Sequence, residues 1–257
     1  MRTKSLFSDA GGKFYLMNEI REVFERSGRH VAVDVFGGSG KFLLNVEARN
    51  KVYNDIDSRL VNLFSVIKER PLEFRQKFES FVYSRELFEK FVDGPQTGEP
   101  VEDAFRTFYV FYCSFAGKGG TFGYQVRDRK SLGRKVVDVS ARLQDFHNEV
   151  QGWTIEHLDF RDLMKRYDSE DAFFYLDPPY FGKKFYRHNF TEKDFDDLAG
   201  ILPDLKGKYL LNINKNEFIL SKFGEPSKES KFKSFCDNAR ASGKRGSRTE
   251  LFYWNIQ

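Results

Sequence analysis

The chain has 257 residues, of which 40% are hydrophobic and 17% aromatic, and its formal net charge is +4. This is enough apolar material for one sizeable core and a smaller subdomain, so we expect the chain to fold unaided. The two cysteines lie far apart and the four histidines are scattered, which excludes a disulfide framework and a zinc-ligand spacing. We expect a cytoplasmic protein with no metal, no secretory signal and no membrane partner.

Basic residues are concentrated in two segments of the chain. Residues 117–135 carry six basic side chains against one acidic side chain, and residues 222–248 carry eight against three. Such segregation is the electrostatic footprint that phosphate binding requires. From charge alone, two solvated basic loops remain an equal alternative.

The N-terminal part of the chain predicts the start of a parallel α/β sheet. Residues 13–27 show the apolar spacing of a helix. Residues 30–36 form a β-branched run that feeds a glycine turn at 37–40. A second strand is predicted at 51–54, followed by an amphipathic helix over 57–69. This order is typical of a parallel sheet with crossover helices.

The pattern changes between residue 71 and about residue 150. This region is rich in Phe at helical spacing, with an interruption of Gly and Lys at 117–123. We interpret it as an inserted helical subdomain, with a possible β-hairpin around 121–126. Strand signals then return at residues 153–158, 172–176 and 208–213.

Two further patterns concern the C-terminal part. Thr191 and Asp194 have the spacing of a capping box, which predicts that a helix starts there. Residues 232–236 and 251–254 predict strands that pair as an antiparallel hairpin at the edge of the sheet.

The glycine turn indicates a class of ligand. Glycines after a buried strand let the backbone approach a ligand at the carboxyl edge of a parallel sheet. The sequence Phe36-Gly37-Gly38-Ser39-Gly40 is neither a P-loop nor a good dinucleotide fingerprint. Asp55, at the end of the next strand, can accept hydrogen bonds from vicinal ribose hydroxyls. Together they predict an adenosine-containing cofactor, and the plain alternatives are a structural turn and a helix N-cap at Asp55 or Asp57.

The most specific pattern is Asp177-Pro178-Pro179-Tyr180, directly after a hydrophobic run. The amino lone pair of adenine is delocalised into the ring, so its attack needs acceptors that bind both amino protons. The Asp177 carboxylate and the Pro178 carbonyl can supply this pair, and the prolines hold the carbonyl rigid. Tyr180 offers a flat face for a base pulled out of a duplex. A proline turn after a strand is the plain alternative.

These motifs resemble the Dam-type, D12 class (alpha-group) DNA N6-adenine methyltransferases over nearly the whole chain. Ala10-Gly11-Gly12-Lys13 is similar to the opening motif of that family, although Asp9 stands where an aromatic residue is frequent. The resemblance implies an α/β fold with a Rossmann-like class I methyltransferase sheet and an inserted, mainly helical target-recognition subdomain. We predict a catalytic domain over residues 1–69 and 151–257 and a DNA-binding insertion over residues 70–150.

The resemblance also implies a set of functional residues. Catalytic roles fall to Lys13, Asp177, Pro178, Pro179 and Tyr180. Cofactor binding falls to Ala10, Gly11, Lys13, Asp34, Phe36, Gly38, Gly40, Asp55, Asp159, Phe160 and Asp177. For DNA binding we predict Lys118, Thr121, Tyr124, Arg127, Arg129, Lys130, Lys244 and Arg245. Phe122 and Tyr124 are candidates for a wedge in the duplex, although aromatic residues in so Phe-rich a chain are more often core.

The implied activity is S-adenosyl-L-methionine-dependent methylation of the N6 amino group of adenine in double-stranded DNA, with base flipping. The recognition segment, residues 115–124, lacks a clear match to members that read GATC, so no target sequence is carried over. The alternatives are an RNA (rRNA) N6-adenine methyltransferase and a catalytically inactive nucleic-acid-binding module. A partner restriction endonuclease stays open, and we expect a monomer or a weak dimer.

The basic segment generates a test. Replacing Arg127, Arg129 and Lys130 together with neutral residues should lower DNA affinity, because fewer counterions are released on binding. The slope of log affinity against log salt should fall by about one for each phosphate that the variant no longer neutralises. The measurement is duplex binding over a series of salt concentrations. An unchanged slope would mean that the segment is a solvated loop.

Overall fold

A seven-stranded sheet forms the centre of the molecule. The computed structural model describes residues 5–7, 16–117, 119–123, 132–183, 187–233 and 247–256. The strands are β1 (Val31–Asp34), β2 (Asn50–Asn54), β3 (Trp153–Glu156), β4 (Ala172–Leu176), β5 (Lys208–Asn214), β6 (Lys228–Lys233) and β7 (Ser247–Trp254). Their spatial order is β3-β2-β1-β4-β5-β7-β6.

The direction of the strands follows from the connections. The five strands from β1 to β5 pair in parallel, whereas β7 pairs antiparallel with both β5 and β6. The chain runs outward from β1 through β2 to β3, then returns to the other side of β1 to form β4 and β5. The reversal between β1 and β4 is the position where open α/β sheets bind ligands. The predicted α/β, Rossmann-like sheet is confirmed.

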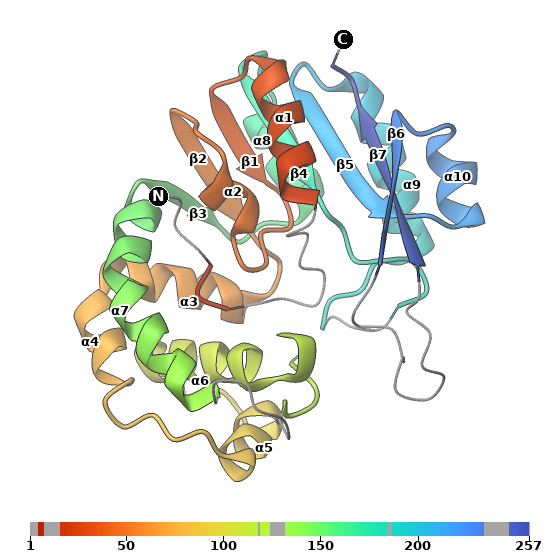
Figure 1. The fold of residues 1–257 in the computed structure, drawn as a ribbon. Helices are drawn as coiled ribbons and strands as arrows, with labels where there is room; N and C mark the ends of the chain where they lie inside the picture. The colour runs from red at the N-terminus through yellow and green to blue at the C-terminus, as the bar shows by residue number, and fades with distance from the viewer. Residues whose placement is uncertain are drawn as a thin grey trace.

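Helices cover both faces of the sheet (Figure 1). On one side lie α1 (Met17–Ser27) and α2 (Lys41–Asn45), and on the other lie α8 (Phe160–Tyr167), α9 (Glu192–Ile201) and α10 (Glu217–Phe223). The side chains of the central strand β4 alternate between two apolar clusters: Phe173 and Tyr175 face the first, Phe174 and Leu176 the second. All five residues of β4 are buried, as expected for a strand covered on both faces.

The inserted region is helical, as predicted. It follows α3 (Ser58–Glu69) and contains α4 (Pro71–Gln76), α5 (Arg85–Asp93), α6 (Pro100–Cys113), the short 3-10 turn η2 (Phe115–Gly117) and α7 (Leu132–Gln151). Figure 1 shows these helices gathered at one end of the sheet. One apolar cluster is continuous from the first sheet face into the helices, through buried rings such as Phe64, Phe108 and Phe146. The insertion therefore packs directly on the sheet.

Most predicted ends of the elements lie close to the observed ones. The capping box is confirmed: the Thr191 side chain accepts from the Asp194 amide, and the Asp194 side chain accepts from the Thr191 amide. The predicted start of the edge strand, at residue 232, is wrong, because β6 begins at Lys228. Its first residues are Lys-Glu-Ser-Lys, and such a polar edge carries no apolar pattern. Of the hairpin predicted at 121–126, Phe122 forms only an isolated bridge with Ser114, and 124–126 lie outside the described residues.

Gly37 is required by close packing against β2. Its N–H donates to the Asn54 carbonyl at 2.7 Å, and a Cβ at this position would lie 2.3 Å from the Tyr53 ring. That ring is fully buried and stacks on Phe64 with ring centroids 4.1 Å apart, so it has no room to move.

Gly37→Ala should lower the free energy of unfolding by about 1–3 kcal/mol, measured in urea. Gly152→Ala is the matched control, because Gly152 lies outside the helices and nothing lies near its added methyl group; equal stabilities of the two variants would contradict a role for this packing.

The start of α3 depends on an ion pair. Asp57 is the N-cap and accepts from the Arg59 amide at 3.0 Å, while the Arg59 guanidinium lies 2.6 Å from its Oδ2 atom. Burial raises the pKa of Asp57, but the bonds from Arg59 outweigh burial and hold this pKa below its usual value. A depressed pKa means that the ionised carboxylate stabilises the fold above its unfolded pKa, and that this contribution is lost as the pH falls through the folded pKa.

Asp57→Asn removes the ion pair with Arg59 but keeps the N-cap, because Asn caps helices nearly as well as Asp. The variant therefore measures the contribution of the ion pair alone. At neutral pH the free energy of unfolding of this variant should be about 0.5–1.5 kcal/mol lower than that of the original chain. The difference should shrink in acid, as the carboxyl group becomes neutral in both states. Denaturant unfolding at several pH values measures it, and a difference that does not change with pH would contradict the assignment.

Candidate active site

The parallel register brings three of the predicted site residues to one level. Asp34 of β1 pairs with Tyr53 of β2 and with Tyr175 of β4. Two residues beyond this level stand Phe36, Asp55 and Asp177. Because the three strands are adjacent, these residues meet at one carboxyl edge of the sheet.

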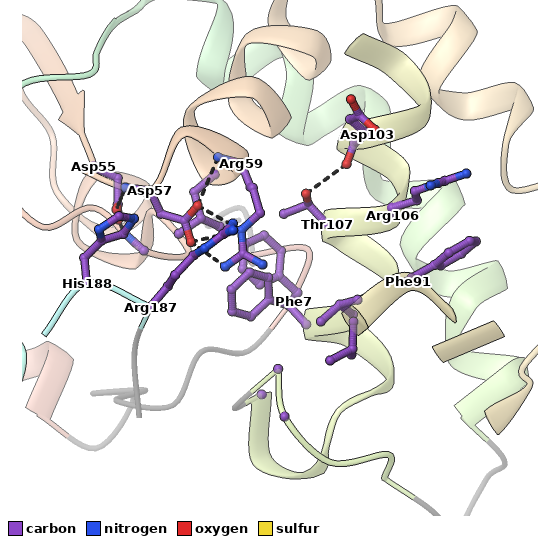
Figure 2. Close-up of a pocket in the computed structure, with 18 of the residues that line it drawn as sticks. Phe7, Asp55, Asp57, Arg59, Phe91, Asp103, Arg106, Thr107, Arg187 and His188 are labelled. Atoms are coloured by element: carbon purple, nitrogen blue, oxygen red, sulfur yellow. Dashed lines mark hydrogen bonds and ion pairs between the residues drawn. The ribbon is translucent and has the colours of Figure 1, made fainter. Parts of the chain in front are cut away.

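All three line one cavity of about 480 Å³, a volume within the range of small-molecule sites. From the sheet edge the cavity is lined by Phe36, Gly38, Asp55, Ile56, Asp177 and Pro179. From the inserted helices it is lined by Phe91, Asp103, Arg106, Thr107, Val110 and Phe111. Figure 2 shows Asp55 on one side and Phe91, Arg106 and Thr107 on the other. The cavity thus lies between the sheet and the insertion.

The glycine turn holds the Asp55 carboxylate in place. Its Oδ2 atom accepts from the Gly38 amide at 2.9 Å, and its Oδ1 atom accepts from the Asp57 amide at 2.8 Å. Gly38 in turn accepts a bond from the Tyr53 hydroxyl at 2.8 Å. The residue that caps α3 is Asp57, so the helix-cap alternative does not account for Asp55. Gly38 and Gly40 have φ values of 51° and 69°, which favour glycine.

The Asp-Pro-Pro-Tyr segment begins directly after β4. Asp177 and Pro179 are half-buried and line the cavity, whereas Pro178 is buried. Tyr180 is half-buried, and its hydroxyl donates to Oε1 of Glu250 at 2.7 Å. Neither Pro178 nor Tyr180 is among the described residues that line the cavity. Asp177 therefore lines the same cavity as Asp55, whereas Tyr180 lies outside its described lining, with its hydroxyl directed to β7.

The predicted pair Asp159 and Phe160 lies behind the cavity wall. Phe160 is buried, and its ring centroid is 6.0 Å from that of Phe36, which lines the cavity. Asp159 caps α8 by accepting from the Arg161 amide at 3.0 Å. The Arg161 guanidinium also pairs with both Asp159 oxygens at 3.1 Å and lies over the Phe160 ring at 4.2 Å. Neither predicted residue is among those described as lining the cavity.

Asp34, the remaining predicted cofactor residue of β1, is 2% exposed at the end of that strand. Several other predicted residues lie outside the described part of the chain: Ala10, Gly11, Lys13, Lys118, Tyr124, Arg127, Arg129, Lys130, Lys244 and Arg245. Thr121 is exposed. Phe122 is 9% exposed and packs on Tyr83 with ring centroids 4.9 Å apart, so it belongs to the core and is not a wedge.

Four basic side chains that line the cavity were not predicted from the sequence: Arg59, Arg106, Arg187 and His188. Arg59 pairs with Asp57, and Arg106 binds Glu102 at 2.8 Å and lies over the Phe91 ring at 5.1 Å. Figure 2 shows Arg187 and His188 projecting toward Asp57 and Asp55. Only Arg59 had a usable signal, because it lies in the first helical turn after the Asp55 strand end.

The described residues contain no helix long and apolar enough to cross a membrane. In the same part of the chain, no three His, Cys, Asp or Glu side chains are grouped to hold a metal ion.

Comparison with known proteins identifies relatives that are DNA methylases. The DNA adenine methylase of Escherichia coli (strain K12) is 27% identical over 185 residues, which cover 70% of this chain and 66% of that protein. The DNA adenine methylase of Salmonella typhi is 27% identical over 191 residues, with the same coverage. The modification methylase StsI of Streptococcus sanguinis is 25% identical over 202 residues, covering 69% of this chain and 28% of that enzyme. This chain thus covers 66% or less of the length of each of these relatives.

The family model for "D12 class N6 adenine-specific DNA methyltransferase" matches residues 10–234, which is most of the chain. The match includes the glycine turn, Asp55 and the Asp-Pro-Pro-Tyr segment, the three features that converge on the cavity. On this basis the chain belongs to the D12 class family of N6 adenine-specific DNA methyltransferases.

Proposed function

We propose that this chain transfers the methyl group of S-adenosyl-L-methionine to the N6 amino group of adenine in double-stranded DNA. The observation that supports it most directly is that Asp55 and Asp177 line one cavity, at the ends of strands that flank the glycine turn. Family membership makes adenine in DNA the leading substrate.

The residues at the sheet edge fit S-adenosyl-L-methionine. Asp55 is held by two backbone N–H groups, which orient its carboxylate at the edge of the cavity. Ile56 is 41% exposed and lines the cavity beside it, so an apolar surface is available for a purine. The Gly38 backbone gives close access between them. The bound cofactor would supply an electrophilic methyl group on its sulfonium.

Asp177 and Pro178 would act on the target amino group. We assign the Asp177 carboxylate and the Pro178 carbonyl as acceptors for the two amino protons, which directs the nitrogen lone pair toward the methyl group. The prolines fix these acceptors before the substrate arrives, and most of the rate would come from orientation and fixed dipoles, with no strong general base. Tyr180 would stack on the extruded adenine, whose unstacking costs a few kcal/mol that phosphate contacts must offset.

The remaining predictions extend this proposal. Residues 1–69 and 151–257 would form the catalytic domain, and residues 70–150, with their basic segment, would recognise the target. Of the residues outside the described part, Lys13 would lie near the active site, and Lys244 and Arg245 would contact the DNA backbone. The relative StsI is a modification methylase, which favours a setting beside a restriction endonuclease. The expected monomer or weak dimer and the cytoplasmic location stay predictions.

Long-read sequencing of genomic DNA tests the activity. The chain would be expressed in a host that lacks DNA methylation, and N6-methyladenine should then appear at one recurrent sequence context. Incorporation of labelled methyl groups into structured RNA instead of duplex DNA would replace this proposal with the RNA alternative. Absence of transfer to either polymer would leave a nucleic-acid-binding module.

Two substitutions separate the roles of the carboxylates. Asp177→Ala should lower methyl transfer by about 100-fold or more, because it removes a fixed acceptor, while cofactor affinity stays close to that of the original chain. Asp55→Ala should weaken cofactor binding by about 10- to 100-fold, the loss in affinity expected when hydrogen bonds to a charged group are removed. Calorimetric titration with cofactor and single-turnover methyl transfer measure the two effects. Loss of both properties in Asp177→Ala would show that its role is misassigned.

A further inference from the structure

A buried carboxylate lies beneath the Asp-Pro-Pro-Tyr loop. Glu250, on β7, is 1% exposed. Its Oε1 atom accepts from the Tyr180 hydroxyl at 2.7 Å, and its Oε2 atom accepts from Nδ2 of Asn212, on β5, at 3.4 Å. Asn212 is fully buried and also donates to the Leu251 carbonyl at 3.3 Å. Glu250 therefore joins the loop to two strands of the sheet.

The antiparallel direction of β7 explains how Glu250 reaches this position. Glu250 pairs with Asn214, the last residue of β5. Because β5 ends at the carboxyl edge, the first half of β7 lies at that edge as well. Tyr180, three residues beyond Asp177, meets it there. No local sequence pattern links these two residues, which are 70 positions apart.

Burial of a carboxylate is a costly way to stabilise a sheet. Removing an ionised carboxyl group from water costs several kcal/mol, and a well-packed apolar residue of similar size usually serves stability as well or better. The neighbours Leu251 and Phe252 are apolar and buried. A hydroxyl that donates to a carboxylate forms one of the stronger and more directional hydrogen bonds. The bond to the Tyr180 hydroxyl gives a reason for burying Glu250 in spite of this cost: it fixes the position of Tyr180.

This contact fixes the far end of the loop. Pro178 is buried at its start, and the Tyr180 carbonyl accepts from the Lys183 amide at 3.1 Å, in a turn where Gly182 has a φ of 71°. A tyrosine hydroxyl lies on the axis of its ring, so anchoring the hydroxyl fixes the direction in which the Tyr180 ring points from the loop. Asp177 then lies between β4 and a loop end that is held at a defined place.

We propose that Glu250 is a positioning residue for methyl transfer: through the Tyr180 hydroxyl it holds the ring and the loop in the arrangement that receives the extruded base. This inference rests on the proposed function. Glu250 is not among the described residues that line the cavity, so it acts through Tyr180.

The test compares two replacements of Glu250 with different chemistry. Glu250→Leu keeps the approximate volume but removes the acceptor. Glu250→Gln keeps an acceptor for Tyr180. Its new N–H group takes the place of Oε2, which faces Nδ2 of Asn212, so the Asn212 amide must turn to present its Oδ1 atom as the acceptor. With tritiated S-adenosyl-L-methionine and unmethylated bacterial genomic DNA, Glu250→Leu should lower the single-turnover rate by about 10-fold or more. Glu250→Gln should keep most of the rate, and cofactor affinity should be unchanged in both.

Tyr180→Phe examines the same contact from the other side. It keeps the aromatic face but removes the hydroxyl, and it does not depend on whether Glu250→Leu folds. Its rate should fall in the same way, and the double variant Tyr180→Phe/Glu250→Leu should be no slower than the slower single variant, because both changes remove one interaction.

Two matched controls lie close by. Tyr253→Phe removes a tyrosine hydroxyl from the same strand, one that donates to the Gly224 carbonyl at 3.1 Å. Glu229→Gln removes a carboxylate from the neighbouring strand β6, where it pairs with Lys215. Both controls should transfer methyl groups at the rate of the original chain.

The outcomes separate this inference from the proposed function. Original-chain rates in Glu250→Leu or Tyr180→Phe would overturn the positioning role and leave the methyltransferase proposal intact. Equal loss of rate and cofactor affinity in both Glu250 variants would show a general structural role and would also overturn it. A chain that transfers no methyl groups even without substitution overturns the proposed function, and the role of Glu250 with it.

Discussion

The parallel pairing of β1 with both β2 and β4 is the constraint on which the site depends. It sets Asp55 and Asp177 at equivalent positions on either side of the glycine turn. Gly37 lets the turn lie directly against the Tyr53 ring, and the amide of Gly38 then holds Asp55. The carboxylate that we propose for the ribose and the one that we propose for the amino group are thereby brought to one edge of the sheet by backbone hydrogen bonds.

The inserted helices complete the other half of the cavity. Their aromatic core is continuous with one face of the sheet, so they close the site as part of the same packed body. Several charged groups of the cavity are matched by partners, as with Arg59 on Asp57 and Arg106 on Glu102. Such pairing limits the cost of placing many charges around one pocket, and it orients the side chains before a substrate binds.

The parts of this structure that short-range sequence patterns encode could be predicted from the sequence. Buried strands, the glycine turn, Asp55 and the Asp-Pro-Pro-Tyr segment are each read from consecutive residues, and parallel topology then brings them together. Thr191 was identified in the same way, because a capping box spans four residues.

What depends on distant contacts was not predictable. Arg106 reaches the cavity only because α6 packs across from the sheet, and Glu250 meets Tyr180 only because β7 runs antiparallel to β5. The start of β6 was misplaced because its polar, edge-facing residues lack a hydrophobic alternation. Phe122 lies in the core, the more frequent position for Phe in so Phe-rich a chain, but the Tyr83 and Phe88 rings that cover it could not be named from the sequence.

A crystal structure of the chain with S-adenosylhomocysteine, the product of methyl transfer from the proposed donor, tests the central claim most directly. We expect the ribose hydroxyls to bind Asp55 and the sulfur to lie between the glycine turn and Asp177. A nucleoside bound outside this cavity, or a sulfur directed away from Asp177, would contradict this claim.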